Sequence, residues 1–119
     1  MARRDLSGAV DFSVLETFAA GDDGLIEEVL NLFREQAQIW APMLDVREPG
    51  WRDAAHTVKG AAAGIGAMEL SEICGAAEQS PRELAPPALD RVRDALDRTL
   101  ADVAAYQHER MLQSLKAPS

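Results

Sequence analysis

The sequence predicts an all-α fold, an antiparallel four-helix bundle with a short N-terminal lid helix. Of the 119 residues, 47% are hydrophobic but only 5% are aromatic, and alanine, which favours helices over strands, supplies much of the apolar content. Apolar residues also recur at helical spacing in segments that glycine or proline separates. A chain of this length holds one core, so we expect a single domain over residues 1–119 with its core at about 10–115.

The first half of the chain predicts the lid helix and one long helix. Asp11 suits the cap of the lid helix, which we expect to reach about Ala20. Asp22 and Asp23 suit the positive end of the long helix, and Pro42 should kink or fray its last turn. The apolar stripe predicted for the long helix consists of Leu25, Val29, Leu32, Phe33, Trp40 and Leu44.

The second half predicts three more helices. Residues 50–64 and 67–79 form a helical hairpin, and the glycines within 64–66 mark its turn. Residues 80–87 form a proline-bearing loop before a long last helix, and residues 116–119 form a frayed tail. The apolar side of the last helix is predicted to consist of Leu89, Val92, Leu96, Leu100, Val103 and Gln107.

Composition excludes several classes of function. The formal net charge of -8 argues against nucleic-acid binding, because an acidic surface repels phosphate backbones. No stretch approaches the roughly 18 apolar residues of a membrane span, and no long apolar signal region follows Met1, so the cytoplasm is the expected location. Cys74 is the only cysteine, so it cannot form an internal disulfide and is predicted to be a small core residue.

The third predicted helix has one apolar side and one nearly bare side. On a helical wheel, its core side consists of Trp51, Ala54, Val58, Ala62 and Ile65. His56 lies opposite, together with Lys59, Gly60, Ala63 and Gly64. An interior glycine costs a helix about 0.5–1 kcal/mol relative to alanine, so this side suits a docking surface. A solvated polar face, tight helix packing at the glycines, and a left-handed cap at Gly64 remain alternative interpretations.

The string from His56 to Ala67, HTVKGAAAGIGA, followed by Leu70, Ile73, Cys74 and Glu78, resembles the histidine-containing phosphotransfer (HPt) domain. The resemblance extends over roughly residues 10–112. It implies that His56 accepts a phosphoryl group from the aspartyl phosphate of a response-regulator receiver domain and delivers it to another receiver. A neutral imidazole suits this role because its nitrogen is nucleophilic near neutral pH. The chain would then be a phosphorelay carrier without autonomous catalysis.

The resemblance also implies roles for the neighbours of His56. Lys59 would offset the charge of the phosphoryl oxygens, and Gly60, Ala63 and Gly64 would give the receiver a close approach. Glu78 would orient the imidazole, although a plain surface glutamate is an equal alternative. No cofactor or metal is expected, since Mg²⁺ in such a relay belongs to the receiver.

Two other functions stay open at this stage. The first is an interaction module, a helical bundle that binds receiver or kinase domains without being phosphorylated. The second is the phosphoacceptor domain of a histidine kinase, cut from a longer chain. Under the relay interpretation the partners are receiver domains and a hybrid histidine kinase. The second histidine of the chain, His108, has no Lys-Gly pair after it and is predicted to be a surface residue.

Overall fold

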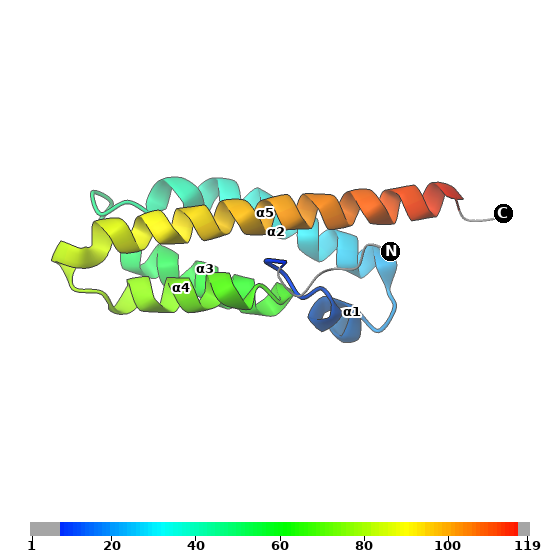
Figure 1. Cartoon of the computed structure of the whole chain (residues 1–119), viewed down its shortest axis with the longest axis horizontal. Helices are drawn as coiled ribbons and strands as arrows, with labels where there is room; N and C mark the ends of the chain where they lie inside the picture. The colour runs from blue at the N-terminus through cyan, green and yellow to red at the C-terminus, as the bar shows by residue number, and fades with distance from the viewer. Residues whose placement is uncertain (1–7, 117–119) are drawn as a thin grey trace.

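The computed structural model describes residues 8–116. Within them lie α1 (Ser13–Ala19), α2 (Asp23–Met43), α3 (Trp51–Ile65), α4 (Met68–Gln79), the 3-10 turn η1 (Arg82–Leu84) and α5 (Ala85–Lys116), and no strand. The four longer helices run antiparallel in an elongated bundle with extents of 57 × 24 × 20 Å, and α1 lies near one end of α3 (Figure 1). The predicted all-α fold is confirmed.

The apolar stripe predicted for α2 is wrong over its first half, whereas Phe33, Trp40 and Leu44 are buried as predicted. The buried residues of α2 are Ile26, Leu30, Phe33, Ala37 and Trp40. Leu32 is instead 55% exposed, and Leu25 and Val29 are only half-buried. Two adjacent stripes of this helix both satisfy helical spacing, and the prediction started on Leu25 instead of Ile26. Packing against the other helices selects the stripe that holds Ile26, Leu30 and Ala37.

Two predicted boundaries shift, at the start of α1 and at the start of α5, whereas α2 begins at the predicted aspartates. Helix α1 begins after Phe12, and the Asp11 carboxylate accepts hydrogen bonds from the backbone N–H and the hydroxyl of Ser13, at 3.1 and 2.6 Å. Asp22 caps α2 by accepting from the Leu25 N–H at 3.0 Å. The loop predicted over 80–87 is shorter, because α5 already begins at Ala85. The two prolines of α5 occupy the first turn of that helix, where the backbone requires no N–H donor.

The turn between α3 and α4 depends on Gly66. This residue, and not Gly64, is the left-handed cap of α3, with φ 90°. Its carbonyl accepts a hydrogen bond from the Asp11 N–H at 2.9 Å, and a Cβ at this position would lie 2.2 Å from the Asp11 carbonyl oxygen. Only glycine combines a positive φ with so close a backbone approach. The hairpin turn is thereby joined to the segment that leads into α1.

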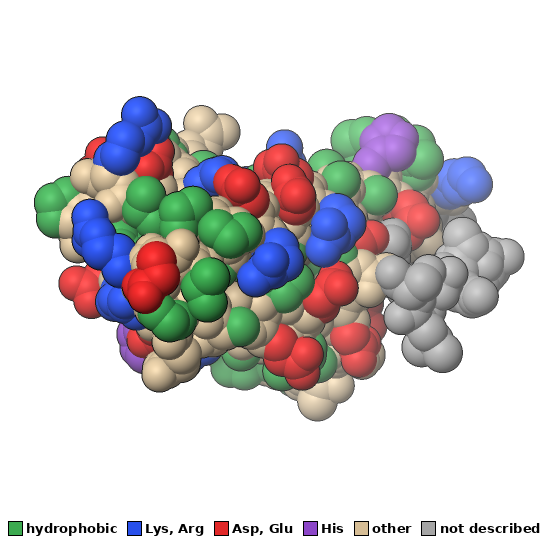
Figure 2. All heavy atoms as spheres, turned by 60° about the vertical axis from the view of Figure 1, so that its left-hand side comes forward, with side chains coloured by type: hydrophobic (Ala, Val, Ile, Leu, Met, Phe, Trp, Pro, Cys, Tyr) green, Lys and Arg blue, Asp and Glu red, His purple; other side chains and the backbone are tan. Residues whose placement is uncertain are grey.

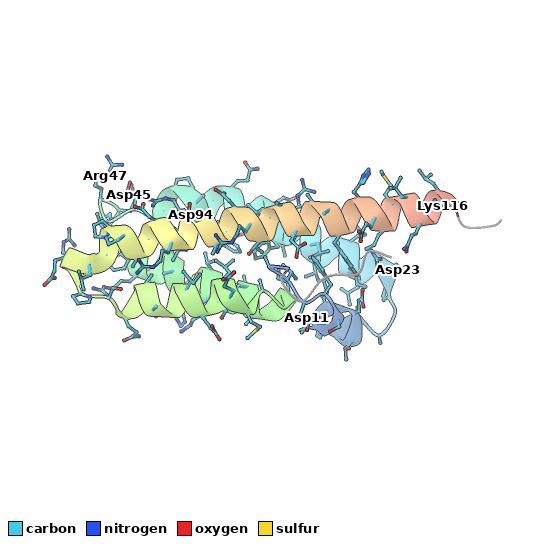
Figure 3. All side chains as sticks on the ribbon, viewed as in Figure 1. Asp11, Asp23, Asp45, Arg47, Asp94 and Lys116 are labelled. Carbon is cyan, nitrogen blue, oxygen red and sulfur yellow. The ribbon has the colours of Figure 1, made fainter. Side chains whose placement is uncertain are left out.

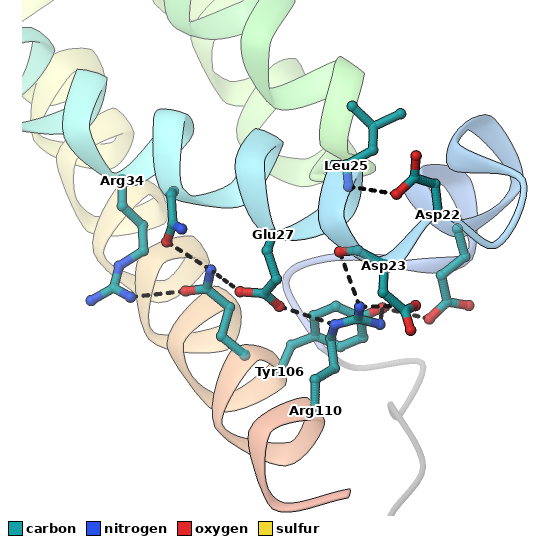
Figure 4. Close-up of polar contacts among 10 residues, drawn as sticks. Asp22, Asp23, Leu25, Glu27, Arg34, Tyr106 and Arg110 are labelled. Carbon is teal, nitrogen blue, oxygen red and sulfur yellow. Dashed lines mark hydrogen bonds and ion pairs between the residues drawn. The ribbon is translucent and has the colours of Figure 1, made fainter. Parts of the chain in front are cut away.

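A polar seam joins α1, α2 and α5 at the end of the bundle where α1 lies (Figure 4). Arg110 contacts the Glu27 carboxylate at 3.0 Å and the Asp23 carboxylate at 3.1 Å. Tyr106 stacks on Phe12 with a centroid separation of 3.8 Å, and its hydroxyl donates to Glu16 at 2.6 Å. Tyr106 of α5 thus holds the lid helix on the bundle, while Arg110 joins α5 to α2 beside it.

The surface carries charges of both signs. Figure 2 shows acidic and basic side chains interspersed over one face, with hydrophobic side chains between them. In Figure 3, Asp45 and Arg47 project from the segment between α2 and α3. Their ion pair, at 2.6 Å, holds the pKa of Asp45 at about 2 through hydrogen bonds from Arg47. None of the described helices combines the length and apolar character needed to cross a membrane.

Replacing Gly66 by alanine tests the hairpin turn. Gly66→Ala is expected to lower the free energy of unfolding by at least about 2 kcal/mol, because the new Cβ meets the Asp11 carbonyl and φ is positive. The matched control, Gly64→Ala, places its Cβ in open space and should raise stability by about 0.5–1 kcal/mol. Urea denaturation measures both. Equal effects of the two substitutions would contradict the turn geometry.

Tyr106 is the only tyrosine of the chain, so its ionisation can be followed directly by ultraviolet absorbance. Burial, with the hydrogen bond to the Glu16 carboxylate, raises the pKa of Tyr106 to about 12. A raised pKa means that the hydroxyl contributes stability that is complete below the unfolded value near 10 and is lost as the pH rises through 12. Glu16→Gln should move the titration midpoint towards 10, whereas Glu28→Gln, an exposed control, should not. A wild-type midpoint at the ordinary value would contradict the contact.

Candidate functional site

Helix α3 presents His56 to solvent because its opposite side is fixed in the core. The five predicted core residues of α3 are all buried, and Ala55, which the wheel did not select, is buried with them. The His56 side chain is 65% exposed, on the side that the wheel predicted. A rigid, well-packed helix therefore holds this imidazole at the surface.

The α3–α4 hairpin places Glu78 opposite His56. Each of the two residues lies eleven positions from Ala67, just after the turn, and positions equally far from the turn of an antiparallel hairpin lie side by side. Glu78 Oε2 is 2.9 Å from His56 Nδ1, and Glu78 Oε1 is 3.1 Å from Lys59 Nζ. One carboxylate thus bridges the histidine and the lysine, so the alternative of an isolated surface glutamate is wrong.

The Glu78 contact determines which imidazole nitrogen is free. The ion pair with Lys59, followed by the charge of His56, lowers the pKa of Glu78 against the opposing effect of its partial burial. An ionised carboxylate can only accept hydrogen bonds, so the shared proton belongs to Nδ1. In the neutral imidazole, Nε2 then carries a lone pair that is directed away from Glu78.

The face around His56 is bare. Gly60, Ala63 and Gly64 are all exposed. A Cβ added at Gly60 or at Gly64 would meet no atom within 4 Å, so the interpretation of these two glycines as sites of tight helix packing is wrong. Gly64 lies inside α3 and does not end it. The structure therefore leaves open space on the side of the helix that carries the histidine.

Arg52 is a site residue that the sequence prediction missed. Its Nη1 donates to the Glu78 carbonyl at 2.6 Å, and its guanidinium lies 4.3 Å from the centroid of the Trp51 ring. The available signal was its position four residues before His56, on the same side of the helix. A second contact steadies the backbone nearby, because the Ser71 hydroxyl donates to the Lys59 carbonyl at 3.2 Å.

The remaining candidates lie apart from this cluster or beneath it. Cys74 is fully buried, as predicted, and burial together with the charge of Glu78 raises the pKa of its thiol to about 12. His108 is exposed near the end of α5. Over residues 8–116, no three histidine, cysteine or acidic side chains are grouped as a metal site would need.

Comparison with known proteins identifies the family. A family model of the Hpt domain matches residues 25–102. The chain belongs to the Hpt domain family. The crystal structure of the histidine phosphotransferase ShpA from Caulobacter crescentus is similar to this Hpt domain, with 57% sequence identity and a TM-score of 0.80. The match covers 91% of this chain and 99% of the ShpA chain. The comparison with curated proteins gave no significant match.

Membership confirms the predicted family and gives the chain its general role. Hpt domains carry phosphoryl groups in phosphorelays, and they interact with receiver domains and kinases of two-component systems. The match spans α3 and α4, and so includes His56, Lys59, Gly60 and Glu78, whereas α1 lies outside it. The site geometry and the family thus concern the same part of the chain.

Proposed function

We propose that this Hpt domain is a phosphorelay intermediate that accepts a phosphoryl group on His56 from the aspartyl phosphate of one receiver domain and transfers it to another. The observation that carries the proposal is the contact between Glu78 Oε2 and His56 Nδ1 at 2.9 Å. It leaves Nε2 unprotonated on a side chain that is 65% exposed. An exposed, oriented nitrogen suits attack on a phosphorus atom that a second protein presents.

The bonds that form and break in the transfer balance between the two proteins. Nε2 attacks the phosphorus, so an N–P bond forms while the bond from phosphorus to the aspartyl oxygen breaks. The aspartate carboxylate of the receiver leaves with the bonding electrons. Nδ1 keeps its proton, and the Glu78 carboxylate offsets the positive charge that develops on the imidazole. Reversal of these steps passes the phosphoryl group to the next receiver.

Lys59 is proposed to adjust the stability of the phosphohistidine. It lies one helical turn after His56, and its side chain is 37% exposed. Two unit charges 4 Å apart attract by about 1 kcal/mol in water and about 4 kcal/mol at an effective dielectric of 20. The exposure of Lys59 places its contribution in the lower part of this range, so it tunes the transfer while His56 carries it.

The bare face is proposed as the site where receivers dock. Gly60, Ala63 and Gly64 would allow the receiver to bring its aspartyl phosphate close to Nε2. The donor and the acceptor would both use this face, because both must reach the same nitrogen. A hybrid histidine kinase as the source of the donor receiver, and a cytoplasmic location, stay predictions.

Removing the imidazole tests the carrier role. His56→Gln should fold like the wild type, because the side chain is exposed, and should accept no phosphoryl group. The matched control, His108→Gln, removes the other histidine and should leave phosphorylation unchanged. Phosphoramidate, which releases ammonia as it donates, serves as a small donor, and ³¹P NMR detects an acid-labile, alkali-stable product.

Two results would contradict the proposal. One is a phosphorylated His56→Gln variant, and the other is loss of phosphorylation in His108→Gln alone. A receiver domain that still binds His56→Ala, while no donor phosphorylates the wild type, would favour the non-phosphorylated interaction module instead.

Gly60→Ala separates docking from chemistry. The substitution should stabilise the fold by about 0.5–1 kcal/mol, because it removes an interior glycine from a helix without a clash. Transfer from a phosphorylated receiver should nevertheless slow by about tenfold, as a loss of roughly 1.4 kcal/mol at the interface implies. The rate with phosphoramidate, which needs no docking, should not change. Equal rates with the receiver donor in both proteins would refute the role of Gly60.

A further inference from the structure

The C-terminal turn of α4 is held by groups from outside its own helix. Helix α4 ends at Gln79 and has no basic residue in its last turn. The Ser80 N–H and hydroxyl donate to the carbonyls of Ala77 and Ala76, at 3.1 and 2.9 Å. The Glu78 carbonyl accepts its hydrogen bond from Arg52 of α3, at 2.6 Å. The last turn, which would otherwise fray, is therefore tied to the helix that carries His56.

Arg52 is itself held in place. Its guanidinium lies 4.3 Å from the centroid of the Trp51 ring, within the range of a cation–π interaction. The Trp51 side chain is buried in the core, so it forms a fixed base for the guanidinium. The positive charge also lies at the negative end of the α4 dipole, where a cation is favourable.

We propose that Arg52 is a positioning residue that holds the main chain of Glu78 and thereby keeps Nδ1 of His56 protonated and Nε2 free. Glu78 is the penultimate residue of α4, so fraying of this turn would displace its carboxylate from both His56 and Lys59. A free histidine in water has no such constraint on its tautomer. The assignment of Nε2 as the phosphoryl acceptor rests on the proposed function, whereas the effect of Arg52 on the tautomer does not.

The structure provides a matched control for Arg52. Helix α2 likewise has no basic residue in its last turn, and Arg93 of α5 donates to the carbonyl of Leu44, the residue that caps α2. Arg93 thus performs the same type of capping on a helix that does not carry Glu78. Removing Arg93 should weaken the bundle without changing the environment of His56.

The experiment measures the tautomer of His56 in the absence of any donor. The chain has only two histidines, so ¹⁵N-histidine labelling gives a spectrum in which His108 is an internal reference. The wild type should show His56 mainly as the Nδ1–H form. In Arg52→Gln, the ratio of the Nε2–H form to the Nδ1–H form should rise by about two- to tenfold, the change that one net hydrogen bond implies. In Arg52→Lys this ratio should return part of the way to the wild-type value. In Arg93→Gln it should equal the wild-type value.

Phosphorylation by phosphoramidate, measured on the same proteins, distinguishes the remaining outcomes. We expect Arg52→Gln to react more slowly in proportion to its loss of the Nδ1–H form. An unchanged tautomer in Arg52→Gln would overturn the proposal. This holds even if phosphorylation slows, because Arg52 would then act by contacting the phosphoryl group directly. Equal tautomer changes in Arg52→Gln and Arg93→Gln would also overturn it. A changed tautomer with an unchanged rate would support the positioning role and contradict Nε2 as the acceptor.

Discussion

The register of the α3–α4 hairpin is the constraint on which the site depends. Gly66 sets this register, because its positive φ turns the chain and its missing side chain admits the Asp11 carbonyl. A shift of one residue in α4 would rotate Glu78 by about 100° away from the imidazole, and a shift in α3 would rotate His56 by the same angle away from Glu78. The link between Gly66 and Asp11 also means that the lid helix and the hairpin are positioned together. The geometry of the cluster is thus set ten residues away from the histidine itself.

Contacts that stabilise the bundle and contacts that orient His56 are largely separate. The polar seam of Arg110, Tyr106 and Glu16 lies where α1 meets the two long helices, whereas the cluster around Glu78 belongs to α3 and α4. The side of α3 that carries His56 contributes little to packing, because a Cβ added at Gly60 or at Gly64 would meet no atom within 4 Å. Helix stability lost at these glycines must be supplied by the core side of α3 and by the seam.

The fold class and the orientation of α3 could be predicted because each rests on one strong periodic pattern. The stripe of α3 contains large residues at Trp51, Val58 and Ile65, so its phase is unambiguous, and His56 follows on the opposite side. In α2 two neighbouring stripes compete, and only packing against other helices selects the one with Ala37. The contacts of Glu78 and Arg52 depend on the register of two helices, which local periodicity does not contain. Family resemblance suggested Glu78, but nothing in the sequence pairs Arg52 with a backbone carbonyl.

The exposures of Glu78, Lys59 and His56 explain how one surface histidine can be oriented on one side and open to solvent on the other. Glu78 is 20% exposed, Lys59 37% and His56 65%. The sheltered carboxylate is screened less by solvent than a fully exposed one, so it holds Nδ1 more firmly, while Nε2 stays in water. Because the pKa of Glu78 is lowered in the folded state, this ionic contact is present at neutral pH and is lost as the pH falls through that lowered value. Below that value the protonated carboxyl group no longer carries the charge that pairs with Lys59 and accepts from Nδ1, so acidification would release the imidazole from Glu78.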